Sequence, residues 1–395
     1  MKRFFAKLKG VGLKDILHIF KFIFAVIPAF FLKKKRKDMW LVCEYENEAR
    51  DNGYWFYKYL REKQPSQDAV YAINRKSGDF EKVKNLGETV SYGSLKHWVY
   101  YLAASVNISS QKGGKPNAAV CYLLEVYGIL KNKRVFLQHG ITKDLADLFF
   151  YENTKMRLFI CGAKPEYDFV SEKFGYPRGY VAYTGFARFD YLLEPYPQKR
   201  QLLISPTWRS FLREASSDPY KQNKAITESE YYKTWKSLLL SSDFQRVCDR
   251  CGYEVKFFPH RNTAHAFDDI EGLPDNIKIA NWEEYDLQLL MKESSLLLTD
   301  YTSSAMDFAY MEKPVLYYQF DYEKYRSGHL AEGYFDYERD GFGKVIKDEA
   351  SLIKEIERFM KGEEDFASYK KRVESFFPLR DKNNCERIYE AVKII

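Results

Sequence analysis

The stretch LLLTDYTSSAMDFAYMEKPVLYYQFDYEKY, residues 296–325, decides the fold, because it predicts a strand, a polar turn, a short helix and a second strand. Its first run, Leu296–Thr299, is apolar on both faces, as in a parallel sheet covered by helices. Pro314 then interrupts the helix and restarts the chain as the apolar run VLYY. Strand–helix–strand units of this kind are typical of α/β proteins.

The turn between the two strands, residues 300–304 (DYTSS), is rich in hydroxyl groups. Ser304 and Asp307 have the spacing of a capping box, which predicts the start of a helix. Unpaired N–H groups at a helix start, together with serine and threonine hydroxyls, favour a bound phosphate. Taken alone, these five residues fit a plain helix cap better than a phosphate site.

The rest of the chain repeats this alternation. At 395 residues it has room for about two domains. The predicted strands of the first half are Trp40–Cys43, Ala69–Ile73, Val106–Ser109, Arg134–Leu137, Leu158–Cys161 and Val181–Tyr183. Those of the second half are Leu202–Ser205, Glu254–Phe258, Ile277–Ala280, Leu296–Thr299, Val315–Tyr318 and Lys344–Ile346. Together they indicate two doubly wound parallel sheets facing a cleft.

We expect four segments along the chain. Residues 1–37 form a basic segment, 38–197 the first Rossmann-like domain and 198–375 the second, with a Pro-rich joint at 194–197 between them. Residues 376–395 contain a closing helix that can pack back on the first domain.

The distribution of charge and the cysteine content restrict the possible binding partners and the cellular compartment. Residues 1–37 hold 11 of the 62 Lys and Arg residues and 1 of the 55 Asp and Glu residues, which leaves 51 basic against 54 acidic residues elsewhere. The excess of +7 is therefore local, which argues against nucleic-acid binding and favours an anionic membrane as partner of the N-terminal segment. Six scattered cysteines fit reduced thiols in the cytosol, and the lone CxxC at 248–251 is interpreted as packing.

The basic segment predicts an amphipathic helix. Polar side chains fall on one helical face, at Lys14, His18 and Lys21. The uninterrupted apolar run Phe22–Leu32 has eleven residues and contains Pro28, whereas a membrane-spanning helix needs about 20. With the cluster KKKRK at 33–37, this favours peripheral anchoring at the cytoplasmic face of the membrane. A signal anchor that crosses the bilayer is the alternative.

Polar side chains follow four predicted strands, at the edge where parallel sheets bind ligands. Gln138, His139 and Gly140 come after the first of these; the glycine permits close approach of a substrate, and His139 is a candidate base, although a single histidine there is more often structural. The run SPTWR at 205–209 includes Thr207 and Arg209, and Arg209 suits a phosphate, a carboxylate or an exposed surface. His260 follows a third strand, and the turn at 300–304 is the fourth.

Four such turns together favour a cleft that binds a phosphorylated ligand. The chain has no GxxxxGK[ST], GxSxG or HExxH motif and no GxGxxG after its first strand, so ATPase, serine hydrolase, zinc protease and simple NAD enzyme functions lack support. His265 follows His260 by five residues, but no carboxylate cluster joins them, and we expect neither a metal site nor a tightly bound cofactor.

Several segments together resemble the CDP-glycerol glycerophosphotransferases, enzymes that polymerise teichoic acids and related polyol-phosphate capsules. The block at 298–325 is similar to the signature of that family. Shorter matches are QHG at 138–140 to a WHG-type motif, SPTWR at 205–209 to APTWR, FFPH at 257–260 to a histidine-proline region, ARDNGY at 49–54 to a DNGY-like segment, and GFARFD at 185–190 to G-x-x-R-x-D. The resemblance covers residues 40–380. Proline precedes His260 where the family usually has the reverse order, and QHGITKD lacks the usual proline after its motif.

The resemblance implies a GT-B-type fold at the cytoplasmic membrane, with the nucleotide held mainly by the second domain. His139 matches the proposed base of the family and His260 the histidine that contacts the donor phosphates. The expected donor-side residues also include Thr207, Arg209, Asp300, Thr302, Ser303 and Ser304. The expected acceptor-side residues are Asp51, Asn52 and Gly140.

The implied reaction joins a CDP-polyol, with glycerol or ribitol as polyol, to a hydroxyl of a lipid-linked or growing polymer and releases CMP. Phosphoryl transfer depends mainly on positioning and charge stabilisation, and free Mg²⁺ can assist. His139 would take the proton, while Arg209, His260 and the turn at 302–304 would neutralise the diphosphate. Two alternatives remain: a nucleotide-sugar glycosyltransferase of the same fold and a non-catalytic membrane-attached binding protein.

Overall fold

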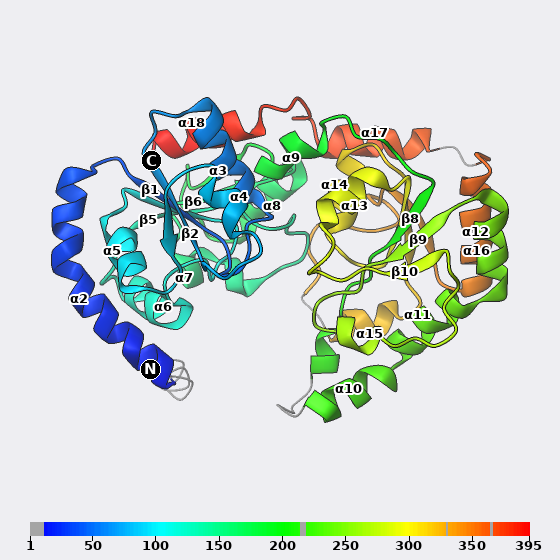
Figure 1. Ribbon diagram of the computed structural model, residues 1–395. Coiled ribbons are helices and arrows are strands. Elements are labelled where there is room, and N and C mark those ends of the chain that lie inside the picture. The colour runs from blue at the N-terminus through cyan, green and yellow to red at the C-terminus, as the bar shows by residue number, and fades with distance from the viewer. Residues whose placement is uncertain (1–11, 214–218, 329–330, 364–365) are drawn as a thin grey trace. The chain divides into compact units, whose positions relative to one another are not determined.

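A computed structural model describes residues 12–213, 219–328, 331–363 and 366–395 (Figure 1). The chain forms two compact units. Unit 1 comprises residues 1–141, 146–191 and 379–395, and unit 2 comprises residues 142–145 and 192–378. Each unit is built around one parallel β-sheet.

The sheet of unit 1 has the strand order β3-β2-β1-β4-β5-β6-β7. Its strands are β1 (Trp40–Cys43), β2 (Ala69–Ile73), β3 (Thr89–Ser91), β4 (Val106–Ser109), β5 (Lys133–Phe136), β6 (Leu158–Cys161) and β7 (Val181–Tyr183). Its helices are α2 (Leu13–Lys35), α3 (Asn52–Lys63), α4 (Phe80–Lys84), α5 (Leu95–Ala103), α6 (Ala118–Val126), α7 (Tyr151–Thr154), α8 (Lys164–Lys173), α9 (Ala187–Leu192) and α18 (Asn384–Lys393), with a 3-10 turn at Asp147–Phe149.

The sheet of unit 2 has the order β10-β9-β8-β11-β12-β13. Its strands are β8 (Gln201–Ile204), β9 (Glu254–Phe257), β10 (Ile277–Ile279), β11 (Leu296–Thr299), β12 (Val315–Tyr318) and β13 (Gly343–Ile346). Its helices are α10 (Pro219–Thr227), α11 (Glu230–Leu240), α12 (Ser242–Cys251), α13 (Leu287–Glu293), α14 (Ser304–Tyr310), α15 (Tyr322–Ser327), α16 (Glu349–Met360) and α17 (Ala367–Phe376), with 3-10 turns at Ser210–Arg213 and Ala264–Ala266.

The central strands are buried because helices cover both faces of each sheet. In unit 1, the residues Leu41 and Val70 belong to a core with Trp98 of α5, whereas Trp40 on the opposite face stacks on Phe56 of α3. This explains why every residue of β1, β2 and β4 is buried, instead of every second one. The predicted doubly wound α/β architecture is therefore confirmed.

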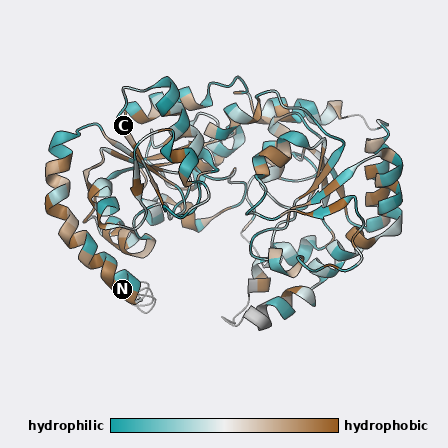
Figure 2. Cartoon of the chain, viewed as in Figure 1, coloured by the Kyte–Doolittle hydropathy of each residue, from teal (hydrophilic) through white to brown (hydrophobic). Residues whose placement is uncertain are grey.

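The longest helix, α2, exposes most of its large apolar side chains, and Figure 2 shows hydrophobic residues along its length. Ala25 and Ala29 are its buried residues, while eleven large apolar side chains between Leu13 and Phe31 are exposed. Its polar face instead contacts the protein: Lys21 Nζ donates to Gly93 O (2.8 Å), and His18 Nδ1 accepts from Trp98 Nε1 (3.0 Å). The helix continues through Pro28 and has the length and composition of a membrane-crossing segment.

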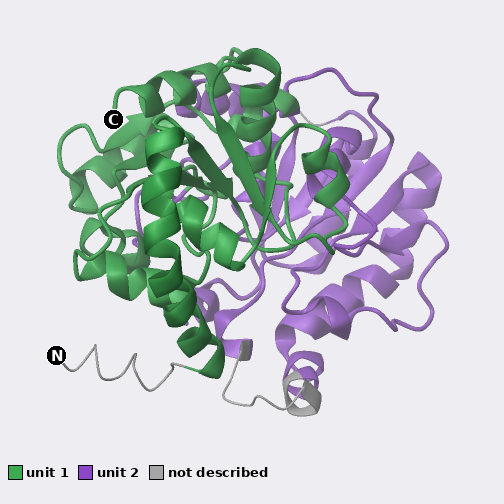
Figure 3. Ribbon diagram, turned by 60° about the vertical axis from the view of Figure 1, so that its left-hand side comes forward, with its two compact units in different colours: residues 1–141, 146–191, 379–395 green, residues 142–145, 192–378 purple. Residues whose placement is uncertain are grey.

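The chain returns to unit 1 after unit 2 is complete (Figure 3). Asp190, in α9, accepts hydrogen bonds from the backbone N–H groups of Asn384 and Cys385 at 3.0 and 2.8 Å. An acidic side chain at this end of α18 also stabilises the helix dipole. The last helix is therefore fixed to unit 1 by a charged cap as well as by its apolar face, which includes Ile388 and Val392.

Candidate active site

In unit 2, the carboxyl ends of three neighbouring strands carry the polar residues that the sequence singled out. His260 follows β9, Thr207 follows β8, and the segment 302–304 follows β11, with β8 between β9 and β11. All of these residues are partly exposed, although the hydroxyl oxygen of Thr207 is buried. Trp208 joins them, with its ring stacked on that of His260 at 5.8 Å between centroids. Unit 2 thus brings the donor-side residues to one edge of its sheet.

Arg209 lies beneath this edge and is fully buried. Its guanidinium forms a bidentate pair with Asp321, through Nε at 2.7 Å and Nη2 at 2.9 Å, and Nη1 donates to Asp300 Oδ2 at 2.8 Å. Nη1 also donates to the carbonyl of Thr207 at 2.6 Å. The two carboxylates raise its pKa although burial opposes the charge. Of the alternatives considered for Arg209, a phosphate, a carboxylate or an exposed surface, the structure has the carboxylate, and Arg209 holds the loops in place from below.

Asp300 is fully buried, like Arg209, and its side chain also forms several hydrogen bonds. Its Oδ1 accepts from the backbone N–H groups of Thr207 (2.8 Å) and Tyr301 (2.6 Å), so it ties the loop after β8 to the loop after β11. Buried charges are stable only when they are paired and hydrogen-bonded. The Arg209–Asp300–Asp321 cluster meets this condition, and we interpret Asp300 as a residue that positions its neighbours.

The start of α14 differs from the predicted capping box. Ser303 occupies the cap position and makes no side-chain cap hydrogen bond, and Thr302 Oγ1 instead accepts from the backbone N–H of Ser304 at 3.3 Å. The Thr302 and Ser304 hydroxyls also bond to each other at 3.0 Å. Spacing identified a helix start correctly but not its cap, because Ser304 already lies inside the helix.

His260 is a neutral side chain at physiological pH. Burial, with a smaller contribution from Arg261, lowers its pKa to about 4. Its Nδ1 accepts from the backbone N–H of Asn262 at 3.2 Å, which leaves the proton on Nε2. His260 can therefore donate one hydrogen bond to an anionic ligand, and it adds no positive charge of its own.

In unit 1, the turn after β5 holds His139. Gln138 takes the left-handed conformation (φ 58°), so Gln138, and not Gly140, makes the unusual turn. The Gln138 side chain is buried and donates to Ile160 O at 2.6 Å and to Glu166 Oε1 at 2.9 Å. Strained backbone of this kind persists only where its surroundings fix it, and it occurs mostly at functional sites.

His139 is solvent-accessible although protein surrounds it. Loss of hydration and the positive charge of Arg188 lower the pKa of His139. The negative charge of Asp51 and the backbone of Ser110 act in the opposite direction, and the net effect is a lowered pKa. A lowered pKa favours the neutral imidazole, which is the form that can accept a proton.

Asp51 and Asn52 hold this turn in place. Asn52 is fully buried; its Nδ2 donates to the carbonyls of Leu137 (3.2 Å) and Gln138 (2.6 Å), and its Oδ1 accepts from the backbone N–H of Arg188 (3.1 Å). Asp51 pairs with Arg188 at 3.0 Å and caps α3. Unit 1 therefore gathers His139 with the three predicted acceptor-side residues, Asp51, Asn52 and the adjacent Gly140.

The sequence analysis missed Glu44, which directly follows β1. Its carboxylate accepts from the backbone N–H groups of Arg50, Asp51 and Tyr54 at 3.0, 3.3 and 2.8 Å. Burial and the neighbouring Asp51 raise its pKa to about 8. A Cβ at Gly53 would lie 2.8 Å from this side chain, which explains a glycine there. The same strand-end rule that found His139 applies to Glu44.

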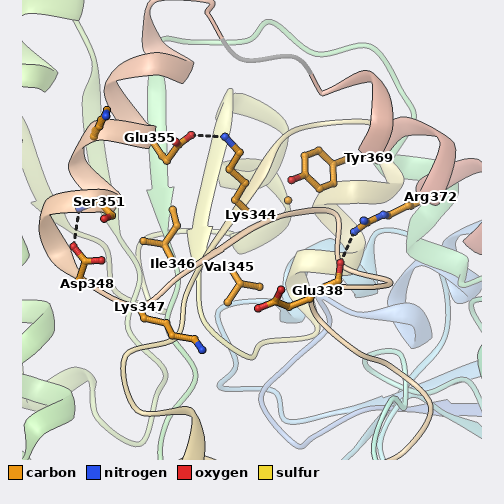
Figure 4. A pocket seen from close by; sticks show the side chains of 12 residues that line it. Glu338, Lys344, Val345, Ile346, Lys347, Asp348, Ser351, Glu355, Tyr369 and Arg372 are labelled. Atoms are coloured by element: carbon orange, nitrogen blue, oxygen red, sulfur yellow. Dashed lines mark hydrogen bonds and ion pairs between the residues drawn. The ribbon is translucent and has the colours of Figure 1, made fainter.

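A separate pocket of about 550 Å³ lies beside β13 (Figure 4). Lys344 Nζ pairs with Glu355 at 2.8 Å, and Arg372 donates to the carbonyl of Glu338 at 3.0 Å within it. None of the residues predicted for the site lines this pocket.

Two doubly wound units with polar strand-end loops define a protein of the GT-B class. Solved structures share this fold: "Structure of the Wall Teichoic Acid Polymerase TagF" has a TM-score of 0.66 at 16% sequence identity and covers 96% of both chains. Other kinds of protein share this fold. A Staphylococcus aureus MnaA–UDP structure matches with a TM-score of 0.57 at 14% identity and covers 90% of this chain and 96% of that one.

Residues 24–393 match the family described as CDP-glycerol:poly(glycerophosphate) glycerophosphotransferase, and the chain belongs to this family. The minor teichoic acid biosynthesis protein GgaB of Bacillus subtilis strain 168 is 31% identical over 90% of this chain and 40% of its own length. A teichoic acid poly(glycerol phosphate) polymerase of the same strain is 29% identical over 47% of this chain and 21% of its own. The chain thus spans less than half the length of these relatives.

Proposed function

We propose that the chain transfers a polyol phosphate from a CDP-polyol to a hydroxyl of a growing or lipid-linked polymer. The acceptor oxygen bonds to the β-phosphorus, the bond from that phosphorus to the bridging oxygen breaks, and CMP leaves. The observation that carries this proposal is the position of His139, which is exposed in the turn after β5 and has Asp51 and Arg188 as charged neighbours, where an imidazole can take the acceptor proton. Family membership supplies the donor class.

The donor side of the proposal rests on unit 2. His260 Nε2–H and the hydroxyls of Thr302, Ser303 and Ser304 donate to the diphosphate in this scheme, and Thr207 has a buried hydroxyl oxygen with no protein partner. Arg209 and Asp300 act indirectly, because both are buried in their ion pairs. Donors fixed before the reaction stabilise charge that develops in the transition state.

Glycerol is the polyol that the relatives favour, since three of them carry poly(glycerol phosphate) polymerase in their names. Ribitol remains the second donor to test. Within the described residues, no group of three or more His, Cys, Asp and Glu side chains is arranged to hold an ion. We therefore propose that any Mg²⁺ that assists arrives with the diphosphate.

The proposal places the enzyme on the cytoplasmic face of the membrane, held by α2. Both ends of this helix are bonded to unit 1: Asp15 accepts from Asn117 Nδ2 at 2.9 Å, and Arg36, which follows the helix, pairs with Asp68 and Glu88. A spanning helix would have to break these contacts or carry charged groups into hydrocarbon. This favours a peripheral helix whose apolar face enters the interface.

The test is incubation with CDP-glycerol, CDP-ribitol, UDP-sugars and GDP-sugars, with the released nucleotide measured in each case. We expect CMP from a CDP-polyol. UDP or GDP would indicate a sugar transferase of the same fold, and calorimetry that detects no nucleotide binding would indicate a non-catalytic protein. His139→Ala should lower turnover at least about a hundredfold and leave donor binding nearly unchanged. Unchanged turnover would exclude His139 as the base.

A further inference from the structure

The turn after β5 that carries His139 is held by a group of buried contacts, which we call the Gln138 clamp. The clamp consists of the Gln138 side chain, the carboxylate of Glu166 in α8 and the backbone carbonyl of Ile160 in β6. All three residues belong to unit 1 and are buried. Glu166 is not among the site residues that the sequence predicted, and its place in the clamp gives it a part in the site.

Gln138 has a backbone conformation that needs support from its surroundings. Within the described part of the chain, the non-glycine residues with positive φ are Gln138, Lys155, Glu312 and Lys382. Gln138 is buried, with 1% of its surface exposed, whereas the other three are at least partly exposed. A left-handed conformation costs free energy in a residue with a side chain, so it persists only where neighbouring groups fix it. The clamp is the group of contacts that fixes Gln138.

Two acceptors set the orientation of the Gln138 side chain. Pairing between β5 and β6 ends at Phe136 and Phe159, and Gln138 Nε2 donates to the next carbonyl of β6, Ile160 O, at 2.6 Å. The same nitrogen donates to Glu166 Oε1 at 2.9 Å. A primary amide carries two N–H protons on one nitrogen, so it satisfies both acceptors at once.

Glu166 is itself held in place. It lies in the first turn of α8, where the helix dipole favours a carboxylate, and its Oε2 accepts from the backbone N–H of Gly162 at 2.7 Å. A Cβ at Gly162 would lie 2.8 Å from the Phe186 ring, so the backbone at this point is closely packed. Capping α8 uses one carboxylate oxygen of Glu166, and the other oxygen is directed to Gln138.

The backbone of Gln138 is held as well as its side chain. Asn52 Nδ2 donates to the Gln138 carbonyl at 2.6 Å, and this carbonyl belongs to the peptide that leads into His139. The direction of the His139 side chain follows from the orientation of this peptide. Contacts from α3, β6 and α8 therefore determine together where the imidazole points, and such support is what keeps a reacting group in productive geometry.

We propose that Glu166 is a positioning residue for His139: it holds the Gln138 side chain and thereby fixes the direction from which the imidazole meets the acceptor hydroxyl. This rests on the proposed function in taking His139 as the base. Glu166 is fully buried, so its effect passes through Gln138. A displacement of about 1 Å can lower a rate about a hundredfold, so a small movement of the turn is enough.

Variants at position 138 separate the clamp from the turn. Glycine and asparagine both tolerate the left-handed conformation, but glycine has no side chain and asparagine is one methylene too short to reach Glu166. We expect Gln138→Gly and Gln138→Asn to lower kcat at least about tenfold, with KM and Kd for CDP-glycerol within about twofold of wild type. Wild-type kcat in Gln138→Gly would show that the turn alone matters and would overturn the proposal.

A second variant tests Glu166 directly. Glu166→Gln keeps the size of the side chain and can still accept from Gly162, but it turns an NH2 group toward the NH2 group of Gln138. We expect a loss of kcat similar to that in Gln138→Gly, and no further loss in the double variant, because both changes remove the same contact. Losses that multiply in the double variant would show independent effects and contradict the clamp.

Asp190→Asn is the matched control. The Asp190 carboxylate also accepts from a backbone N–H and from a side-chain amide, those of Asn384 at 3.0 and 2.7 Å, but it serves α18 and not the turn after β5. Urea unfolding gives the stability of every variant, and rates are measured where all are folded. We expect Asp190→Asn to lose stability and keep kcat. An equal loss of kcat in this control would show a general response to a weakened helix cap and would overturn the proposal.

A measurement without turnover separates this proposal from the proposed reaction. In protein labelled with 13C-histidine, the Cε1–H signal of His139 is one of six and is assigned by its loss in His139→Ala. We expect this signal to shift or broaden in Gln138→Gly and Glu166→Gln and to stay in place in Asp190→Asn. If it does so in a protein that releases CMP from no CDP-polyol, the clamp stands and the proposed reaction fails. If the protein releases CMP and the signal is unchanged in all variants, the reaction stands and the clamp fails.

Discussion

His139 sets the expected pH dependence of the reaction. A base must be neutral to accept a proton, and the surroundings of His139 lower its pKa below the usual 6.5. The acid limb of kcat/KM should therefore lie below pH 6.5, with full activity at pH 7. Rates measured from pH 4.5 to 8 with CDP-glycerol test this. An acid limb above pH 7 would point to a different base.

Loss of Arg209 should strongly destabilise unit 2. Arg209→Ala leaves Asp300 and Asp321 buried without their counter-charge, which typically costs about 3–5 kcal/mol. Urea unfolding measures this change. Arg246→Ala is the control, because Arg246 pairs with Asp243 on an exposed helix face and its loss should change stability by less than about 0.5 kcal/mol. Similar losses for both variants would contradict the positioning role of Arg209.

Helix α2 is the element whose environment the sequence defined least. The periodicity correctly predicted a helix with a polar and an apolar face. It did not predict which face packs against unit 1, because that depends on partners such as Trp98 and Gly93, which are distant in sequence. Polar side chains on a surface helix normally face water. Here His18 and Lys21 face unit 1, and eleven large apolar side chains are left for another environment.

This inverted orientation predicts the behaviour of a double variant. Phe20→Asp with Phe24→Asp places charge on exposed positions of α2, so it should move the protein from the membrane pellet to the supernatant while the unfolding transition stays the same. Leu240→Asp, at an exposed apolar position in unit 2, is the control and should remain in the pellet. If the double variant still sediments with membranes, α2 is not the anchor.

The strands were the most predictable elements. Seven of the twelve predicted strands have the observed bounds, among them Leu296–Thr299, and the other five differ by one residue at one or both ends. Thr89–Ser91 was missed because it is short, lies at the sheet edge and is only partly buried, so it lacks the apolar run of a central strand. Burial alone does not decide the outcome, because Val181–Tyr183, another three-residue edge strand that is only partly buried, is apolar in sequence and was predicted with its observed bounds.

For the molecule as a whole, the sequence correctly predicted that the site residues follow strand ends, but it could not predict which of them are accessible and which are buried. Thr207, His260 and Thr302 are accessible, whereas Arg209 and Asp300 are sealed beneath them. Both sets come from the same short motifs, so spacing alone cannot separate them. Burial distinguishes the accessible residues from the buried ones. The burial of Arg209 depends on Asp321 and on the surrounding aromatic rings, which come from other parts of unit 2.

Glu44 predicts how the stability of the entire chain varies with pH. Its pKa is about 8 in the folded protein against 4.5 when unfolded, so the folded state holds a proton that the unfolded state has lost between these values. Stability from this group is fully present below about pH 4.5 and is lost as pH rises toward about 8. Urea unfolding at pH 5 and pH 8 should show a difference that Glu44→Gln reduces. An equal difference in the variant would show that other groups cause it.

The attachment of α18 to Asp190 also governs the order in which the chain can mature on the ribosome. Unit 1 is begun first, yet residues 379–395 emerge only after the whole of unit 2 has been translated. Until then, the surface of unit 1 that α18 covers in the folded protein is exposed. This surface includes Ala187, whose carbonyl accepts a hydrogen bond from the Cys385 thiol at 3.5 Å. Chaperone demand during synthesis should accordingly fall on the half that is translated first.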